Sequence, residues 1–204
     1  RFEARPLPDE AQFAPGFGVV VADFDGDGRE DLFLAQNFSA TETGTPRYDA
    51  GRGLLLLGDG QGGGGGGFHP MPGQYSGIAL YGDQRGAAAA DFDGDGRADL
   101  AVAQNAGETK LYRNAGAAPG LRVKLIGPAG NPNGIGAGVR IRYEDGDGPL
   151  REIAAGSGYW SQDGAVAVLG LRSTPRSVWV RWPGGREQVV EVKGRTEVVI
   201  TPNP

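Results

Sequence analysis

The sequence predicts an all-β protein on three observations. Short runs rich in Val, Leu and Ile alternate with clusters of Gly, Pro, Asn and Asp, a pattern typical of strands and turns. No window carries the 3.6-residue apolar period of an amphipathic helix. Glycine and proline supply 38 and 14 of the 204 residues. That share approaches the composition of disordered chains, but the β-rich runs favour a folded, many-stranded protein.

An internal repeat organises the first 117 residues. VVADFDGDGREDLFLAQN at Val20–Asn37 returns as AAADFDGDGRADLAVAQN at Ala88–Asn105, an offset of 68 residues. A second apolar strand is expected after each copy, at Gly53–Leu57 and Lys110–Tyr112. A repeated multi-stranded unit of this length suits a β-propeller blade. The glycine tract Gly62–Gly67 between the copies is expected to form a flexible loop tip, because glycine has no side chain to pack.

Residues 118–204 predict a second unit, a β-sandwich, so we expect domains at 1–117 and 118–204. Seven short strands are expected there, a number and spacing typical of sandwiches. They are Leu121–Ile126, Gly138–Tyr143, Leu150–Ala154, Ala165–Leu169, Ser177–Trp182, Gln188–Val192 and Glu197–Ile200. Alternation along Ser177–Trp182 places Trp179 and Arg181 on the face away from the core. Hairpin turns are expected at Asp145–Gly148 and Pro183–Gly185, whose residues tolerate positive φ.

Composition and charge exclude several classes of function. The chain has no Cys and one His, so disulfides, thiolate sites and multi-histidine zinc sites are excluded. Residues 1–117 carry 9 Lys and Arg against 17 Asp and Glu, a net of −8, and residues 118–204 carry 11 against 8, a net of +3. The basic residues are dispersed, which argues against nucleic-acid binding. No apolar run approaches the roughly 20 residues that span a bilayer.

The two repeats contain predicted metal-binding loops. Carboxylates stand at loop positions 1, 3, 5 and 9, with glycine at position 6 and a backbone carbonyl at position 7, and Ca²⁺ prefers six to eight such oxygen ligands. Position 12 holds Leu34 or Val102 in place of the bidentate Glu of an EF-hand, so an EF-hand is excluded. We predict two Ca²⁺ sites. Their ligands are Asp23, Asp25, Asp27, the carbonyl of Arg29 and Asp31 in the first loop, and Asp91, Asp93, Asp95, the carbonyl of Arg97 and Asp99 in the second.

Both halves of the chain resemble known families. The DxDxDGxxD loops with flanking apolar strands resemble the FG-GAP/VCBS repeats of integrin-type β-propellers. Asn133–Val139, Gly156–Gln162 and Val180–Gly185 resemble signature segments of the ASPIC/UnbV domain, which follows such repeats in cartilage acidic protein-like proteins. The resemblance implies an extracellular or cell-surface calcium-binding protein with no established catalytic activity. Two repeats are too few to close a propeller, so we expect a longer protein or neighbouring copies to complete it.

The sequence therefore predicts a non-enzymatic, secreted or surface-exposed calcium-binding module for adhesion or structure, with an extracellular protein or glycan as its unidentified ligand. A subunit of a fibre that self-associates head to tail is an alternative, favoured by the charge difference between the halves. A metal-dependent hydrolase is a second, weaker alternative, which would require acid/base groups in a cleft outside the calcium loops. A serine hydrolase is disfavoured because AGSGY around Ser157 lacks the outer glycines of a nucleophile elbow.

Two weaker signals carry explicit expectations. Asn37-Phe38-Ser39 fits an N-glycosylation sequon and predicts an exposed loop. Trp160, Trp179 and Trp182 are expected to pack in or near the core rather than to form a sugar-stacking platform.

Overall fold

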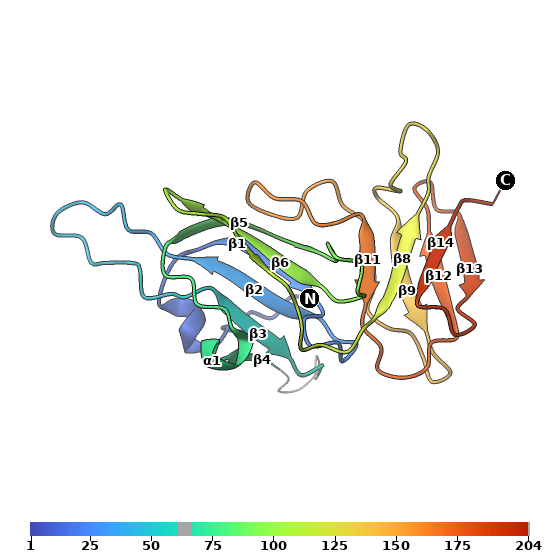
Figure 1. Cartoon of the computed structure of the whole chain (residues 1–204), viewed down its shortest axis with the longest axis horizontal. Helices are drawn as coiled ribbons and strands as arrows, with labels where there is room; N and C mark the ends of the chain where they lie inside the picture. The colour runs from blue at the N-terminus through green and yellow to red at the C-terminus, as the bar shows by residue number, and fades with distance from the viewer. Residues whose placement is uncertain (61–66, 204) are drawn as a thin grey trace.

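The predicted all-β fold is confirmed in a computed structural model that describes residues 1–60 and 67–203 (Figure 1). Within these residues, fourteen strands form four sheets, and helix is confined to the 3₁₀ turn η1 (Asp9–Gln12) and the single-turn α1 (Gly73–Ser76). The loop predicted at Gly62–Gly67 lies outside the described residues except for Gly67. No helix in the described part of the chain is long and apolar enough to cross a membrane.

Each repeat forms one antiparallel sheet, with its acidic loop between the first two strands. The first sheet has the order β1-β2-β3-β4 and contains β1 (Gly16–Ala22), β2 (Asp31–Gln36), β3 (Leu54–Gly58) and β4 (Phe68–Met71). The second has the order β5-β6-β7 and contains β5 (Asp83–Ala90), β6 (Asp99–Asn105) and β7 (Lys110–Tyr112). The pairing shifts between Gly16 and Val19 in one sheet and between Gln84 and Ala87 in the other, which are equivalent positions at the 68-residue offset.

The two repeat sheets share one hydrophobic core. Val20 and Phe33 of the first sheet and Val102 of the second are fully buried in it, because the apolar faces of β1, β2, β5 and β6 meet there. On the far face of the first sheet, the N-terminal residues Leu7 and Ala11 pack against a smaller cluster of leucines. Burial of these faces is the main stabilising contribution to the N-terminal half.

The C-terminal residues form two sheets around a separate core. One has the order β11-β8-β14, with β8 (Leu121–Leu125), β11 (Val166–Leu169) and β14 (Glu197–Ile200). The other has the order β10-β9-β12-β13, with β9 (Gly138–Arg142), β10 (Arg151–Glu152), β12 (Ser177–Arg181) and β13 (Glu187–Glu191). Val123, Val139 and Val178 are fully buried between these sheets.

Most strand predictions hold to within a few residues, with three informative differences. The strand expected at Leu150–Ala154 shrinks to β10, and β4 is a strand that the sequence analysis did not predict. Trp179 faces away from the core as predicted but is only 5% exposed. It is covered because the Arg140 guanidinium lies 4.5 Å from its ring centroid.

Both predicted hairpin turns are confirmed. Asp145–Gly148 connects β9 to its antiparallel neighbour β10, and Pro183–Gly185 connects β12 to β13. Gly184 and Gly185 have φ of 90° and 89°, the left-handed conformation that a two-residue hairpin turn requires.

Segments from the C-terminal half lie directly against the repeats (Figure 1). The Ala89 amide of β5 donates to Oδ1 of Asp163 (2.8 Å), and the Gly164 amide donates to the Ala89 carbonyl (2.8 Å). Arg151 donates to the Val21 carbonyl (2.9 Å) and pairs with Glu30. The ends of β1 and β5, where the acidic loops begin, are therefore held against the C-terminal residues.

Candidate metal centre

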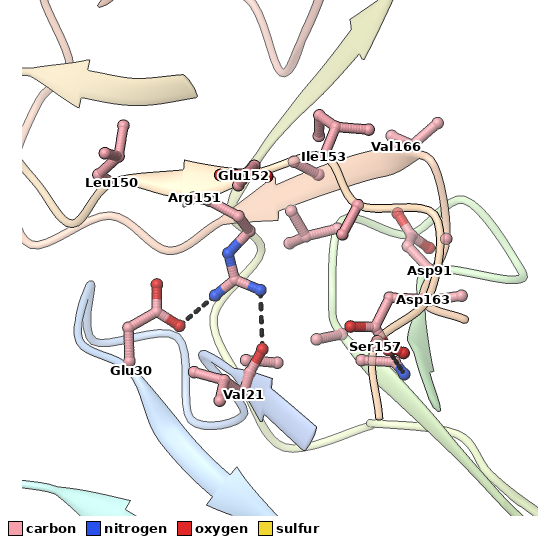
Figure 2. Close-up of a pocket in the computed structure, with 18 of the residues that line it drawn as sticks. Val21, Glu30, Asp91, Leu150, Arg151, Glu152, Ile153, Ser157, Asp163 and Val166 are labelled. Carbon is pink, nitrogen blue, oxygen red and sulfur yellow. Dashed lines mark hydrogen bonds and ion pairs between the residues drawn. The ribbon is translucent and has the colours of Figure 1, made fainter. Parts of the chain in front are cut away.

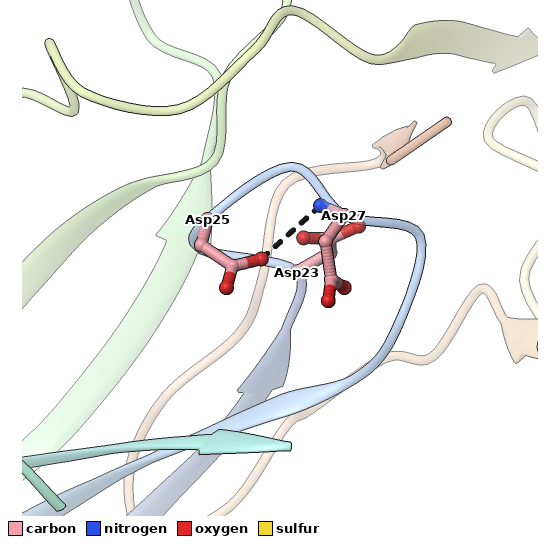
Figure 3. A group of neighbouring side chains, drawn as sticks. All are labelled: Asp23, Asp25 and Asp27. Carbon is pink, nitrogen blue, oxygen red and sulfur yellow. Dashed lines mark hydrogen bonds between the residues drawn. The ribbon is translucent and has the colours of Figure 1, made fainter. Parts of the chain in front are cut away.

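The first acidic loop gathers carboxylates between β1 and β2 (Figure 3). Asp23, Asp25 and Asp27 each offer an oxygen, and these oxygens lie within 4.8 Å of one another. Backbone amides close the turn: Gly26 and Gly28 donate to the two oxygens of Asp23 at 2.6 and 2.7 Å. Positive φ at both glycines, 81° and 88°, gives the loop its sharp curvature.

The second loop repeats this construction between β5 and β6. Asp91, Asp93 and Asp99 form the second carboxylate group, with oxygens again within 4.8 Å of one another. The amides of Asp95 and Gly96 donate to the two oxygens of Asp91 at 3.0 and 2.9 Å. The repeated sequence therefore produces a similar acidic turn twice.

The aspartate at position 9 has a separate role that the sequence did not indicate. Asp31 is fully buried and accepts the amides of Phe24 (2.7 Å) and Gly58 (2.9 Å). Asp99, 2% exposed, accepts the equivalent amides of Phe92 (3.1 Å) and Asn114 (2.7 Å). Each carboxylate thus joins the start of its loop to the third strand of its sheet or the residues that follow it.

Burial makes two carboxylates of the first loop, those of Asp23 and Asp31, costly to ionise. Desolvation raises the pKa of Asp23 to about 7, although the amides of Gly28 and Gly26 favour the ionised form. Desolvation likewise raises the pKa of Asp31 to about 6. In the second loop, burial raises the pKa of Asp99, whereas the hydrogen bond from Arg113 lowers the pKa of Asp93. A divalent cation would favour the ionised form of the buried groups, because it supplies the opposite charge they lack.

These donors fit a hard divalent cation. Three carboxylates converge in each loop, and carboxylate and carbonyl oxygens are the ligands that Ca²⁺ prefers. Asp27 of the first loop belongs to its converging group, whereas Asp31 does not; in the second loop Asp99 belongs and Asp95 does not. The full ligand set, including the carbonyls of Arg29 and Arg97, stays a prediction.

Residues of the C-terminal half contact both loops. A Cβ at Gly170 would lie 1.6 Å from Oδ2 of Asp23, so glycine is the residue that leaves room for this carboxylate. At the second loop, Arg122 of β8 pairs with Asp91, whose side chain is fully buried. The first carboxylate of each loop therefore lies at the boundary between the repeats and the C-terminal sheets.

A cavity of about 340 Å³ lies at this boundary (Figure 2). Its walls are mainly apolar, and its polar groups include Arg151, Glu30 and Asp163. All three have partners: Arg151 pairs with Glu30, and Asp163 accepts the Ala89 amide. Burial raises the pKa of Asp163. Ser157 also lines the cavity but His69 does not, and the His69 ring instead lies 3.2 Å from Asp59, so the described cavity holds no serine–histidine pair.

Comparison with known families finds one match in each half of the chain. Residues 85–118 match the FG-GAP repeat, and residues 127–203 match the family described as ASPIC and UnbV. The chain carries an FG-GAP repeat followed by an ASPIC and UnbV domain. The FG-GAP match contains the second acidic loop, β6 and β7. No curated protein matches the chain.

These matches confirm the predicted order of an FG-GAP repeat followed by an ASPIC and UnbV domain, whereas the likeness of the first repeat and of the whole chain to cartilage acidic protein-like proteins stays a prediction. FG-GAP repeats are usually extracellular or on the cell surface and are typically non-catalytic, and together with the ASPIC and UnbV domain they indicate an adhesion-like β module. FG-GAP repeats often bind Ca²⁺, and the acidic groups of this chain could hold such an ion.

The tryptophan prediction holds for two of the three residues. Trp179 and Trp182 are each 5% exposed, whereas Trp160 is 90% exposed in a loop of the ASPIC and UnbV domain. Because only one of the three rings is exposed, they do not form a joint sugar-stacking platform.

The prediction of an exposed loop around the sequon is wrong at Asn37, the residue that would accept the glycan. Asn37 is fully buried with φ of 85°, and its amide nitrogen donates to the Gly51 carbonyl (2.9 Å) while its oxygen accepts the Gly51 amide (2.7 Å). Asparagine tolerates this positive φ because its short polar side chain can form hydrogen bonds with nearby backbone groups, here those of Gly51.

This burial gives a prediction for the folded protein. Glycosylation would modify the side-chain amide of Asn37, which is hydrogen-bonded to Gly51. We therefore expect the folded protein to gain no glycan mass when it is treated with an oligosaccharyltransferase. Asn37→Ala is expected to lower the free energy of unfolding by about 2 kcal/mol, because it leaves buried backbone groups unpaired. Intact mass and urea unfolding test the two parts, and glycan on the folded chain would contradict the placement of Asn37.

Proposed function

We propose that this chain is a calcium-binding, non-enzymatic module of an extracellular or surface protein. The observation that supports this proposal is the duplicated acidic turn, in which three carboxylates converge within 4.8 Å in each of two equivalent loops. Such groups repel one another when ionised, and a divalent cation removes the repulsion. In this proposal, Ca²⁺ binding and local folding of the loops are coupled.

Calcium is favoured over magnesium and over zinc, copper and nickel. The donors are oxygens only, whereas zinc, copper and nickel sites usually include nitrogen or sulfur ligands, and Mg²⁺ retains several waters in octahedral geometry. Extracellular modules commonly bind Ca²⁺ at 10⁻⁴ to 10⁻³ M, a range that the extracellular fluid fills and the cytosol does not. A surface location therefore supplies the ion at the concentration that such a site needs.

The contacts of the acidic side chains support a structural role for the ion. The buried carboxylates of Asp23, Asp31 and Asp99 accept backbone amides within their own repeats. An ion bound there would join β1 to β2 and β5 to β6 rather than face a substrate. We propose that the stabilised β surface serves adhesion or matrix assembly, with a protein or glycan as its partner.

Calcium-dependent thermal stability tests the metal site. We expect Ca²⁺ at about 100 times its dissociation constant to stabilise the chelator-stripped protein by about 2.7 kcal/mol, which raises Tm by roughly 5–10 °C. Asp25→Ala is expected to reduce this increase while leaving Tm in chelator nearly unchanged, because Asp25 is exposed and contributes little to packing. Asp9→Ala removes an exposed aspartate that lies outside both acidic loops and serves as the control. Equal losses for Asp25→Ala with and without Ca²⁺ would show that this carboxylate does not act through the metal.

A further inference from the structure

The two acidic loops have the same sequence pattern but different electrostatic surroundings. In the first loop, one of the carboxylates at positions 1, 3 and 5 pairs with an arginine: Asp27 with Arg29 at 3.0 Å. In the second loop, each of the three pairs with an arginine. These pairs are Asp91 with Arg122, Asp93 with Arg113, and Asp95 with both Arg97 (2.9 Å) and Arg113 (3.0 Å).

Arg113 has no charged counterpart in the first repeat. Register defines the equivalence, since Leu55 pairs with Phe33 on β2 and Leu111 pairs with Ala101 at the equivalent place on β6. The residues two positions after Leu55 and Leu111 are Leu57 and Arg113. The next residues, Gly58 and Asn114, donate their amides to the position-9 aspartates, which confirms the alignment.

The C-terminal half of the chain, residues 118–204, contacts the two loops differently as well. Against Asp23 it presents Gly170, which has no side chain. Against Asp91 it presents Arg122, which also pairs with Glu197 on β14. The Arg122 guanidinium therefore contacts the first carboxylate of the second loop and is held in place by Glu197.

These ion pairs leave the two acidic loops with different formal charges. Four aspartates and Arg29 leave the first loop at −3, and Glu30 is balanced by Arg151. Four aspartates and Glu197 with Arg97, Arg113 and Arg122 leave the second loop at −2. The first loop is therefore more negative than the second by one formal charge, and its position-1 and position-3 carboxylates have no arginine partner among the described residues. Affinity for Ca²⁺ depends on ligand charge, so the loops should differ.

Resting on the calcium-binding function proposed above, we infer that the first loop, Asp23–Asp31, is the principal calcium site and that Arg113 and Arg122 substitute for the ion's charge in the second loop, Asp91–Asp99. The second loop keeps its shape through these pairs when calcium is absent. It binds Ca²⁺ at least about tenfold more weakly than the first loop, because the ion must displace or adjoin guanidinium groups.

Calorimetric titration of the full, chelator-stripped chain with CaCl₂ tests the inference, with Asp25→Asn and Asp93→Asn as a matched pair at position 3. We expect one tight site in the unchanged protein, lost in Asp25→Asn and retained in Asp93→Asn. Arg113→Leu introduces the residue found at the equivalent place in the first repeat, and the arginine is 55% exposed, so folding is preserved. It should raise the affinity of the second site about tenfold.

Lys110→Leu removes the same charge from β7, the strand that Arg113 directly follows, and is the control, since Lys110 pairs with Glu108 and not with the loop. Two sites of equal affinity, with each asparagine variant removing one, would overturn this inference and leave the proposed calcium function standing. No heat of binding in any variant, with no calcium-dependent Tm, would overturn both.

Discussion

Replacement of Gly170 by alanine is expected to abolish calcium binding at the first loop and to destabilise the whole chain. The added Cβ would lie 1.6 Å from Oδ2 and 2.5 Å from Cγ of Asp23. Asp23 can make room only by giving up the amides of Gly26 and Gly28, which hold both of its oxygens. The loop would then lose the carboxylate at its first position together with the turn that presents it.

The backbone around Gly170 is held in place, so the side chain of Asp23 must move. Tyr143 donates its hydroxyl to the Gly170 carbonyl (3.3 Å). The guanidinium of Arg172, two residues after Gly170, lies 4.2 Å from the Tyr143 ring centroid. It also pairs with both carboxylate oxygens of Asp145, at 2.7 and 2.8 Å. Overpacking of such a site costs about 1–3 kcal/mol, before the lost hydrogen bonds are added.

Calcium titration and urea unfolding of Gly170→Ala measure these effects. Gly130→Ala is the matched control, because a Cβ there meets no atom within 4 Å and its φ is not positive. We expect the control to behave like the unchanged protein and Gly170→Ala to lose about 3 kcal/mol of unfolding free energy. Normal calcium affinity in Gly170→Ala would show that the ASPIC and UnbV domain does not constrain the first loop.

The features that the sequence predicted are local in the chain. The acidic turns depend on alternating aspartates and on glycines within nine residues, and the hairpins at Asp145–Gly148 and Pro183–Gly185 depend on positive-φ residues at the turn. Strands such as β12 follow from apolar alternation. Each of these patterns can be read without knowing what lies opposite in space.

The features that the sequence could not predict depend on contacts between distant residues. Asp91 and Arg122 are 31 positions apart, and Asp23 meets Gly170 only because the C-terminal sheets pack on the repeats. Trp179 is buried by an arginine on a neighbouring strand. Asn37 fits a glycosylation sequon, but its side chain is used to bind Gly51. A glycine in the sequence gives no sign that it leaves space for a carboxylate elsewhere.

The position-9 aspartates illustrate this limit and provide a second large effect. The repeat places Asp31 beside the other carboxylates and predicts a metal ligand. The structure shows both of its oxygens accepting amides, from Phe24 at 2.7 Å and Gly58 at 2.9 Å, in a fully buried site. Its principal contribution is therefore expected to be hydrogen bonding that joins the loop to β3.

Asp31→Ala is expected to lower the free energy of unfolding by about 3 kcal/mol, since each buried amide left without an acceptor costs about 1–3 kcal/mol. The loss should be of similar size in calcium and in chelator, unlike that of Asp25→Ala, which should depend on calcium. Asp31→Asn retains one acceptor oxygen of the same shape and is expected to lose about half as much. Urea unfolding of these variants in both conditions separates the two roles. If Asp31→Ala lowered the free energy of unfolding only in calcium, Asp31 would be chiefly a metal ligand. Water would then have replaced its carboxylate as the acceptor of the two amides.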